Sequence, residues 1–402
     1  MLPESRRMNG SPLINVPFLM TKLRLFYLMT GLFGGFFAPY LALLLQSEGF
    51  SSAATGSVMA VGTLLAILVQ PVWGLVVDRY HITRPLLVLT FIAPAAVGAM
   101  FNSRQLVVVM VAYTLTMVFS APQAPISDAF AVEAAGTTYG TIRSFGSLGY
   151  AIAGYVGGLY VEHLSVHTIW APYALIGLVG GSIGLLLPAG RTEDVGVGAG
   201  LRGGLRILLT NRRFLLFLLG GFLISETLTA FNTFFVLAYK DIGGTLSTAG
   251  IAFFVASLTN VPAMLIASRV IRRVGGTNTM LLAGLIYAVR WGVQALVPIP
   301  LVAIAVQVLH GSSFGFFYVA AVDFVAQTTT RDLQATGQSV FGMVCGGAAS
   351  VAGNLGNGVL LRVGGPALMY GACALASLAG AACFAWIARL EAAERRRSAA
   401  GR

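Results

Sequence analysis

Charged residues are scarce in this chain of 402 residues, at 10% of the total against about 25% in an average soluble domain. Hydrophobic residues make up 57%, and the mean hydropathy is +0.83. So few charged side chains cannot cover a surface that faces water, which excludes ordinary soluble enzymes. The high hydrophobicity also excludes intrinsic disorder. The composition therefore predicts an all-α polytopic membrane protein.

Cysteine is rare, and the motifs of several chemistries are missing. Cys345, Cys373 and Cys383 have neither the spacing of a disulfide framework nor that of a metal site. The chain contains no phosphate-binding glycine loop and no Gly-x-Ser-x-Gly nucleophile elbow with a partner histidine. We therefore expect no enzymatic activity, no metal and no cofactor. Any transport must use an ion gradient, for which we expect the proton gradient, or run downhill.

Long apolar runs, in contrast, are abundant. A membrane-spanning helix needs about 20 mostly apolar residues, and we expect twelve such spans, at 25–46, 53–76, 85–102, 105–130, 139–161, 168–188, 214–238, 248–268, 277–297, 300–326, 336–360 and 366–388. The expected organisation is a cytoplasmic N-terminal segment, a six-helix bundle, a cytoplasmic linker, a second six-helix bundle and a basic cytoplasmic tail, at 1–24, 25–188, 189–213, 214–388 and 389–402. The start of the chain does not resemble a cleavable signal peptide, because the apolar run after residue 24 is too long.

Basic residues outnumber acidic ones by 25 to 14 and lie in short gaps between the apolar runs. Twelve spans place 20 of the 25 on the side of the two termini. Positive charge is retained on the cytoplasmic side of membranes, so both termini are expected to be cytoplasmic. The size of the chain and the lack of a targeting segment lead us to expect a cell inner membrane. Because the basic residues do not gather on a soluble domain, we expect no nucleic-acid partner.

The two halves of the chain look alike in one respect. A basic loop around Asp78 and Arg79 follows the second span, and a matching loop at 268–276 follows the eighth. This suggests an internal repeat of six helices, which is typical of alternating-access transporters. Asp78 and Arg79 are expected to act as a conformational latch. Glycine pairs four residues apart are expected at helix contacts, namely Gly31 and Gly35, Gly154 and Gly158, and Gly342 and Gly346.

Six ionisable residues lie inside the expected spans, where a charge costs roughly 2.5–3.5 kcal/mol on insertion scales. Asp128 and Arg143 flank one hairpin and are expected to pair. Glu226, Arg290 and His310 all fall near the midplane, and we expect them to form one polar cluster in the C-terminal half. Asp323 lies thirteen residues after His310 and therefore on a different face of the helix, and it is expected to serve in gating.

Purely structural roles remain open for these residues. Asp128 with Arg143 can be a structural bridge, and Arg290 can be a counter-charge to Glu226. His310 can be a hydrogen-bonded core histidine. Aromatic side chains in the spans are more often packing residues than ligands, but some can stack on a sugar or a nucleobase. Beside Asp128 and Arg143, the candidate substrate contacts are Tyr40, Asn232 and Trp291.

Several segments resemble the major facilitator superfamily over nearly the whole chain, and in particular its branch of lactose permease, nucleoside–proton symporters and phenylpropionate-type permeases. The resemblance rests on residues 125–130 around Asp128, 139–149 around Arg143, 287–291 around Arg290, 308–315 around His310, and 333–338. It implies two six-helix bundles, sugar binding by Asp128 and Arg143, and proton coupling through Arg290 and His310.

The chain also departs from that branch. Lactose permease has a glutamate three residues after its span-10 histidine, where this chain has Ser313, and a lysine three residues before it, where this chain has Gln307. The acid of span 8 is Asn260 here. If protons are coupled, Glu226, Asp128 or His310 must therefore carry them.

The sequence thus predicts a secondary active transporter that works by rocker-switch alternating access, and the family resemblance implies a monomer. The expected function is proton-coupled symport of a small polar solute, either a sugar or a nucleoside, or an aromatic carboxylate clamped by paired arginines. The alternative is proton-driven efflux of drugs or sugars, although residues 153–158 lack the proline of the usual efflux motif. A transporter-like sensor or a lipid flippase is a third alternative, disfavoured by the charged midplane. Expected partners are the small-molecule substrate and membrane lipid.

Overall fold

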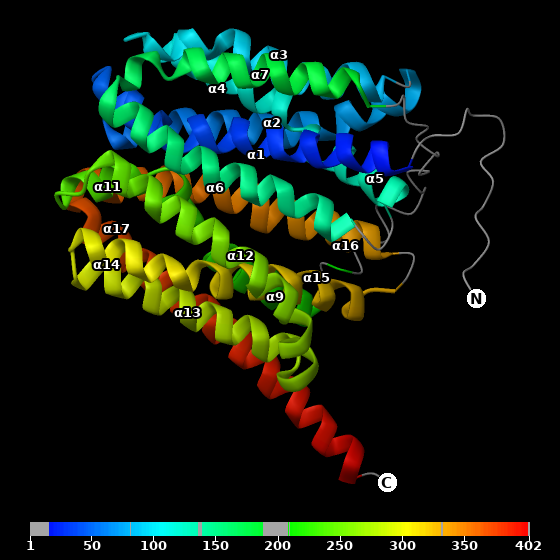
Figure 1. The fold of residues 1–402 in the computed structure, drawn as a ribbon. Helices are drawn as coiled ribbons and strands as arrows, with labels where there is room; N and C mark the ends of the chain where they lie inside the picture. The colour runs from blue at the N-terminus through cyan, green and yellow to red at the C-terminus, as the bar shows by residue number, and fades with distance from the viewer. Residues whose placement is uncertain are drawn as a thin grey trace, which may run out of the picture.

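The computed structural model describes residues 16–80, 82–135, 139–187, 208, 210–330 and 333–400, and within these ranges every regular element is helical (Figure 1). The elements of the N-terminal half are α1 (Val16–Ser47), α2 (Ser52–Tyr80), α3 (Thr83–Val97), η1 (Gly98–Asn102), α4 (Leu106–Ser120), α5 (Gln123–Ala135), α6 (Tyr139–His163), η3 (Val166–Thr168) and α7 (Trp170–Leu185).

The C-terminal half contains longer helices interrupted by short turns. Its elements are α9 (Arg212–Ser225), α10 (Leu228–Asn232), α11 (Phe235–Asp241), α12 (Leu246–Val274), α13 (Gly276–Leu296), α14 (Pro300–Ala305), η4 (Val306–Val308), η5 (Gly311–Gly315), α15 (Phe316–Thr328), α16 (Gln334–Phe341), η7 (Gly342–Ala348) and α17 (Ala349–Ala400). Two of the turns, η5 and η7, are π-helical, a form that is frequent at functional sites.

Ten segments of the described chain are long and apolar enough to cross a membrane. The last of these, Thr336–Arg397, has 62 residues, far more than the 20 or so that one crossing needs. Gly365 interrupts it with φ 66° and ψ −166°, a backbone conformation that glycine adopts without steric cost. Helix α1 begins at Val16, inside the segment that we expected to precede the first span.

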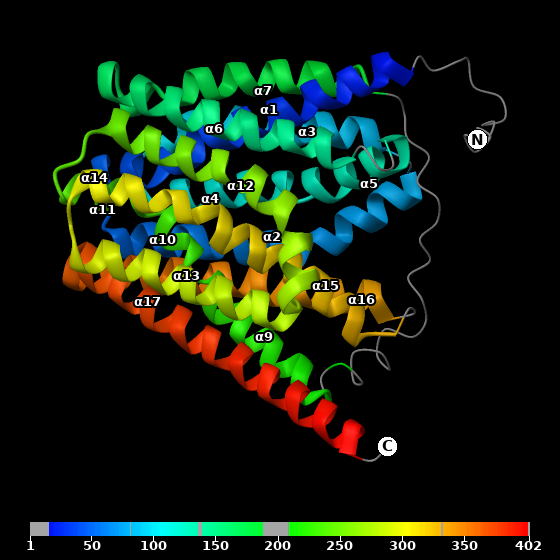
Figure 2. The same ribbon diagram turned by 60° about the horizontal axis from the view of Figure 1, so that its bottom comes forward.

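The two halves lie side by side, one above the other in Figure 1, and the first and last described helices begin and end at the same end of the bundle. The first turn of α1 and the last turn of α17 lie there, and we call this the terminal end. Figure 2 again shows the start of α1 and the end of α17 at the same end of the bundle. The helix pairs α6 with α12 and α2 with α17 join the halves.

The distribution of polar residues is the reverse of that in a soluble protein. Arg290 and Gln307 are fully buried, whereas Leu265 and Leu296 are 72% and 83% exposed. Apolar side chains on the outside and paired polar groups inside are what a lipid environment favours. The exposure of individual side chains is therefore that of a helical bundle embedded in a membrane.

The halves are closed against each other at the end opposite the termini. A Cβ on Gly154 would lie 2.9 Å from Phe253 Cβ, and a Cβ on Gly158 would lie 2.6 Å from the Leu246 carbonyl oxygen. Only glycine permits so close an approach of α6 and α12. The Ser52 hydroxyl of α2 donates to the Gly358 carbonyl of α17 at 2.9 Å, which joins the second pair of helices at this end.

The expected role of the glycine pairs is confirmed for two pairs and wrong for the third. A Cβ on Gly35 would lie 2.6 Å from the Tyr150 carbonyl oxygen, so α1 and α6 pack directly on each other. Gly342 and Gly346 meet nothing within 4 Å. Their spacing falls in the π-helical turn η7, which changes the face that residues four apart share.

Candidate functional site

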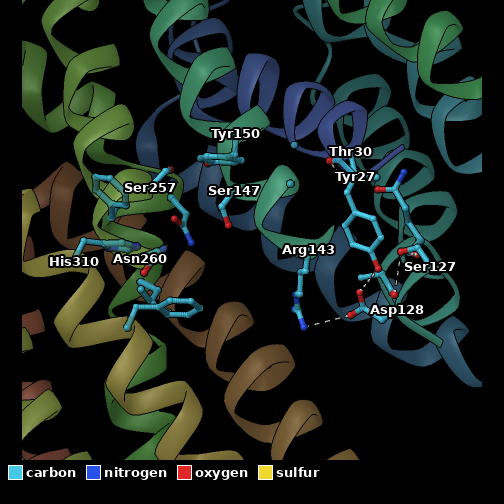
Figure 3. A pocket seen from close by; sticks show the side chains of 18 residues that line it. Tyr27, Thr30, Ser127, Asp128, Arg143, Ser147, Tyr150, Ser257, Asn260 and His310 are labelled. Carbon is cyan, nitrogen blue, oxygen red and sulfur yellow. Dashed lines mark hydrogen bonds and ion pairs between the residues drawn. The ribbon is translucent and has the colours of Figure 1, made fainter. Parts of the chain in front are cut away.

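A cavity of about 440 Å³ lies between the two halves near the middle of the bundle (Figure 3). Elements of both halves line it, which is the place where two-bundle transporters bind substrate. Its walls are formed by Tyr27, Thr30, Gly31, Gln123, Ala124, Ser127, Asp128, Arg143, Gly146, Ser147, Tyr150, Leu228, Phe231, Asn232, Ser257, Asn260, His310 and Phe314.

The N-terminal wall is organised around the carboxylate of Asp128 on α5. The Tyr27 hydroxyl of α1 donates to Asp128 Oδ1 at 2.6 Å, and Arg143 Nη1 of α6 lies 3.5 Å from Asp128 Oδ2. The ion pair that the sequence predicted is therefore present, and Tyr27 completes it. Half of the Arg143 side chain and 26% of the Asp128 side chain are exposed, so water reaches this wall.

The C-terminal wall carries two buried polar atoms without a hydrogen-bond partner in the described structure, Asn260 Oδ1 and His310 Nδ1. His310 is only 7% exposed, and its ring lies 5.2 Å from that of Phe231 and 5.8 Å from that of Phe314. A buried polar atom left unpaired costs free energy. Both residues line the cavity (Figure 3), so a polar solute there can supply the missing partners.

A close contact between α12 and η5 places these two residues together. A Cβ on Gly311 would overlap the Thr259 carbonyl, and the Gly311 amide donates to the Thr259 hydroxyl at 3.2 Å. Because Gly311 follows His310 and Thr259 precedes Asn260, the contact fixes both side chains at one level of the cavity. The glycine is thus required for the geometry of this wall.

Arg290 lies behind the cavity wall and does not line it. Its Nε and Nη2 both donate to Gln307 Oε1, at 3.2 and 2.5 Å. The guanidinium lies 4.7 Å from the centre of the Phe231 ring and 4.3 Å from that of Trp291, within the range of cation–π attraction. Among the described residues no acid pairs with it. The cation is stabilised by an amide and two aromatic rings.

The predicted cluster of Glu226, Arg290 and His310 is only partly assembled. Phe231 lies against both Arg290 and His310, which connects these two. Glu226 follows α9, and its backbone carbonyl accepts from the Thr229 hydroxyl at 2.9 Å. Within the described residues, its carboxylate has neither a hydrogen bond nor an ion pair.

The remaining predicted residues divide between the cavity and its surroundings. Asn232 lines the cavity. The Tyr40 hydroxyl donates to the Gly154 carbonyl and Trp291 Nε1 donates to the Thr227 hydroxyl at 3.0 Å, and neither side chain reaches the cavity. Asp323 accepts from Gln327 at 2.7 Å and lines a separate basic pocket.

The two predicted latch residues, Asp78 and Arg79, show few contacts in the described structure. The Arg79 guanidinium lies 5.8 Å from the centre of the Tyr80 ring. The side chain of Asp78 lies outside the described residues.

Sequence reasoning missed Tyr27 and Asn260 as site residues. Tyr27 was one of six aromatic residues in the first span, and nothing in its spacing separates a hydrogen-bonding tyrosine from a packing one. Asn260 occupies the position at which the related branch has an acid, and this position was the signal that could have identified it. Because an amide carries no charge, Asn260 was not predicted as a site residue.

At the closed end one acidic residue bridges the halves. The Ser247 amide, in the first turn of α12, donates to Glu162 Oε2 in the last turn of α6 at 2.5 Å. This hydrogen bond holds the pKa of Glu162 below its usual value, because the charged form is the better acceptor. The carboxylate also lies at the positive end of the α12 dipole.

Comparison with known proteins gives matches over most of the chain. Residues 20–372 match the model of the family described as MFS_1 like family. The chain is 31% identical to maltose permease of Geobacillus stearothermophilus, over 87% of this chain and 90% of that protein. It is 25% identical to raffinose permease of Escherichia coli, over 74% and 76% of the two chains. The crystal structure of the nucleoside transporter NupG superposes with a TM-score of 0.80 at 18% identity, covering 93% of this chain and 99% of that one, which shows a shared fold.

Proposed function

Because the chain belongs to the MFS_1 like family of the major facilitator superfamily, it is a membrane transporter and not an enzyme, and we propose that it is a proton-coupled symporter of a sugar or a nucleoside. The observation that carries the proposal is the cavity between the halves. It presents the Asp128–Arg143 pair on one wall and two unpaired polar atoms, on Asn260 and His310, on the other. A solute rich in hydroxyl groups both donates and accepts hydrogen bonds, so it suits both walls.

The proposed topology has twelve crossings with both termini in the cytoplasm. The ten long apolar segments become twelve when the last is counted twice, because Gly365 interrupts it, and when α6, with 25 residues, is added. The basic residues on the side of the termini support the orientation. The closed end then faces outward, and the exposed Arg143 marks the cytoplasmic side of the cavity.

Alternating access follows from the same arrangement. The outer end is closed by glycine contacts between α6 and α12, while water reaches the Asp128–Arg143 pair from the inner side. Rocking of the halves about the cavity would open the outer end and close the inner one. This is the rocker-switch mechanism, and each molecule contains all the parts for it, so we propose that the protein acts as a monomer in the inner membrane.

The proton site is proposed at Glu226, and Arg290 and His310, which both pack on Phe231, are proposed to couple its protonation to transport. A carboxylate inside the membrane without a partner is more stable when it is protonated. Arg290 donates to Gln307 through Nε and Nη2, whereas its buried Nη1 has no hydrogen-bond partner in the described structure. This nitrogen can therefore bind an acid that moves toward it.

An aromatic carboxylate is a less suitable substrate. Two arginines would be needed to clamp it, and only Arg143 lines the cavity, whereas Arg290 lies behind Phe231. The names of the sugar permeases and of the nucleoside transporter among the similar proteins also support the hydroxyl-rich solute.

The test is solute-induced proton movement in lightly buffered, energised vesicles that contain the full chain. Sugars, nucleosides and aromatic acids are added one at a time to wild type, to Glu226→Gln and to Glu391→Gln, an acid outside the cavity. We expect a sugar or nucleoside to alkalinise the medium with wild type and Glu391→Gln, and not with Glu226→Gln. Proton release from acid-loaded vesicles with expulsion of a lipophilic dye, and no response to any solute, would instead establish efflux.

A further inference from the structure

A second large pocket opens at the terminal end of the C-terminal half. It has a volume of about 920 Å³ and lies where α12 and α15 end, α13 begins and α17 passes beside them. Figure 1 shows α17 extending past its neighbours at this end, and an ion pair between Arg213 of α9 and Glu394 holds that part of α17 to the bundle. All walls of the pocket belong to one half, so it is separate from the cavity between the halves.

Four arginines line this pocket, and we call it the arginine pocket. Two lie in the last turn of α12 and two on α17, namely Arg272, Arg273, Arg389 and Arg395. All four are exposed, and none of them has an ion pair or a hydrogen bond within the described residues. Four guanidinium groups around one space are therefore available to a ligand.

The two acids of the pocket do not neutralise these arginines. Glu391 accepts a hydrogen bond of 2.9 Å from the Thr277 hydroxyl of α13, and Asp323 accepts one of 2.7 Å from the Gln327 amide. Within the described structure, both carboxylates are thus held by neutral donors. Four arginines against two acids leave the pocket positive, so it favours an anion.

The chemistry and the size of the pocket favour a phosphate that carries further groups. The planar fork of a guanidinium binds two oxygen atoms of one phosphate or carboxylate. A volume of about 920 Å³ lies at the upper end of the range for sites that enclose whole small molecules. A single inorganic ion would leave most of this space unfilled.

The pocket lies at the depth of lipid headgroups. Trp386 of α17 is 60% exposed, and exposed tryptophans are enriched at the boundary between the hydrocarbon and the headgroups. The pocket begins two residues further along the helix, at Ala388, which is about 3 Å at 1.5 Å per residue. The apolar segment that ends at Val274 also ends in the wall of the pocket.

An exposed apolar stripe leads from the pocket along α13. Asn278 lines the pocket, and Leu282, Leu285 and Val289 follow at steps of four, three and four residues, which places all four side chains on one face of the helix. The three apolar side chains are 41%, 42% and 56% exposed. Acyl chains can lie along this stripe while their headgroup is in the pocket, whereas a free phosphate would not use it.

We propose that the arginine pocket binds the phosphate of an anionic phospholipid, whose acyl chains lie along the exposed stripe of α13. In the proposed topology this lipid belongs to the cytoplasmic leaflet. The site goes beyond the proposed function and does not depend on which solute is carried. Because its walls belong to one half, rocking of the halves leaves the pocket intact and the lipid in place.

The experiment measures retention of radiolabelled lipid by the immobilised full chain in mixed micelles. Phosphatidylglycerol is the anionic lipid and phosphatidylethanolamine the zwitterionic one. Ala392→Glu adds an acid inside the pocket, and Ala393→Glu adds the same acid at the next residue, which does not line it. Both alanines are exposed, and thermal unfolding without added lipid shows that each variant is folded.

A second pair of variants removes charge instead of adding it. Arg272→Gln combined with Arg273→Gln takes two arginines out of the pocket. Arg396→Gln combined with Arg397→Gln takes two from the exposed part of α17 that does not line it. The second double variant therefore controls for the loss of positive charge at this end of the bundle.

We expect wild type to bind phosphatidylglycerol at least about tenfold more tightly than phosphatidylethanolamine, because each basic residue near a membrane surface adds to the attraction of anionic lipid. The two variants outside the pocket should keep that preference. The two variants inside it should reduce the preference to about threefold or less.

Three results would overturn the proposal. The first is equal binding of the two lipids by wild type. The second is a preference that persists in both variants inside the pocket, or that falls equally in the variants outside it. The third is displacement of phosphatidylglycerol by inorganic phosphate at a comparable concentration, which would show a site for free phosphate. We expect displacement to need at least about a hundredfold more inorganic phosphate, since it lacks the buried acyl chains.

Discussion

The Tyr27 hydroxyl donates a hydrogen bond of 2.6 Å to Asp128 Oδ1, which ties the carboxylate of α5 to the first helix of the bundle. The other oxygen of the same carboxylate faces Arg143 of α6. The carboxylate is therefore held from two helices before any solute binds. Such preorganisation lowers the cost of ordering the site on binding.

Tyr27→Phe removes one bond to this carboxylate and leaves the aromatic ring. A hydrogen bond to a charged group contributes about 1.5–3 kcal/mol, so we expect the affinity for substrate to fall about tenfold or more. The control is Tyr160→Phe, whose hydroxyl bonds Thr168 outside the cavity. Unchanged affinity in Tyr27→Phe would mean that the hydroxyl does not orient Asp128.

Arg143→Lys tests whether the arginine acts through its charge alone. Lysine keeps the charge but loses the planar, forked donor that fits a carboxylate and a second acceptor together. We expect a loss of about tenfold or more in substrate affinity, with thermal stability unchanged, because the Arg143–Asp128 pair is partly exposed and exposed pairs contribute little to stability. Full retention of affinity in the lysine variant would contradict a two-acceptor role.

Gln307 is the hydrogen-bond acceptor of the buried Arg290. Two replacements distinguish loss of this acceptor from a change in its charge. Gln307→Leu leaves the guanidinium without its acceptor, and we expect a destabilisation of about 1.5–3 kcal/mol. Gln307→Glu offers a charged acceptor of the same shape, and the melting temperature should lie above that of the leucine variant. Thermal unfolding in one detergent measures all three proteins. Equal melting temperatures would show that Gln307 does not support Arg290.

Gly158→Val tests closure at the closed end of the bundle, which we propose faces outward. The Cβ of valine would lie 2.6 Å from the Leu246 carbonyl oxygen, so the closed arrangement of α6 and α12 must shift, at a cost of about 1–3 kcal/mol. We expect the population to move toward the outward-open form. A Ser257→Cys reporter in the cavity should react faster with an impermeant maleimide added outside, in a chain whose native cysteines are replaced. Gly342→Val, at a position with open space, is the control and should not change the rate.

Glu162 gives the outer closure a dependence on pH. Its pKa is held below the usual value by the hydrogen bond from the Ser247 amide, so the contact is fully formed above the ordinary pKa of a glutamate, about 4.3. It is lost as the pH falls through the lowered pKa. We expect Glu162→Gln to raise labelling of the same reporter about two- to fivefold at neutral pH. The labelling rate of wild type should approach that of Glu162→Gln only under strongly acidic conditions. A wild-type rate that already rises between pH 7 and 5 would show that protonation of Glu162 does not control the closure.

Local features of the sequence were sufficient for the architecture. Apolar runs of about 20 residues, separated by basic gaps, predicted an all-helical membrane bundle in two halves, because the cost of unpaired backbone groups in lipid leaves few alternatives. The Asp128–Arg143 pair was also predictable, since both residues flank one short hairpin and neighbouring antiparallel helices bring them together. Each of these predictions depends on residues close in the chain or on a simple count.

The composition of the substrate site was decided by the tertiary structure alone. Tyr27 reaches Asp128 over 101 positions of sequence, and the Trp291 side chain does not line the cavity. Asn260 lines the same cavity as His310 because Gly311 lets η5 approach α12 closely. Whether a residue faces the cavity depends on how each helix is rotated and tilted against its neighbours, and a π-helical turn such as η5 resets that rotation. The sequence therefore determined that the fold is an all-helical membrane bundle, and long-range packing determined which side chains of its helices meet in the cavity.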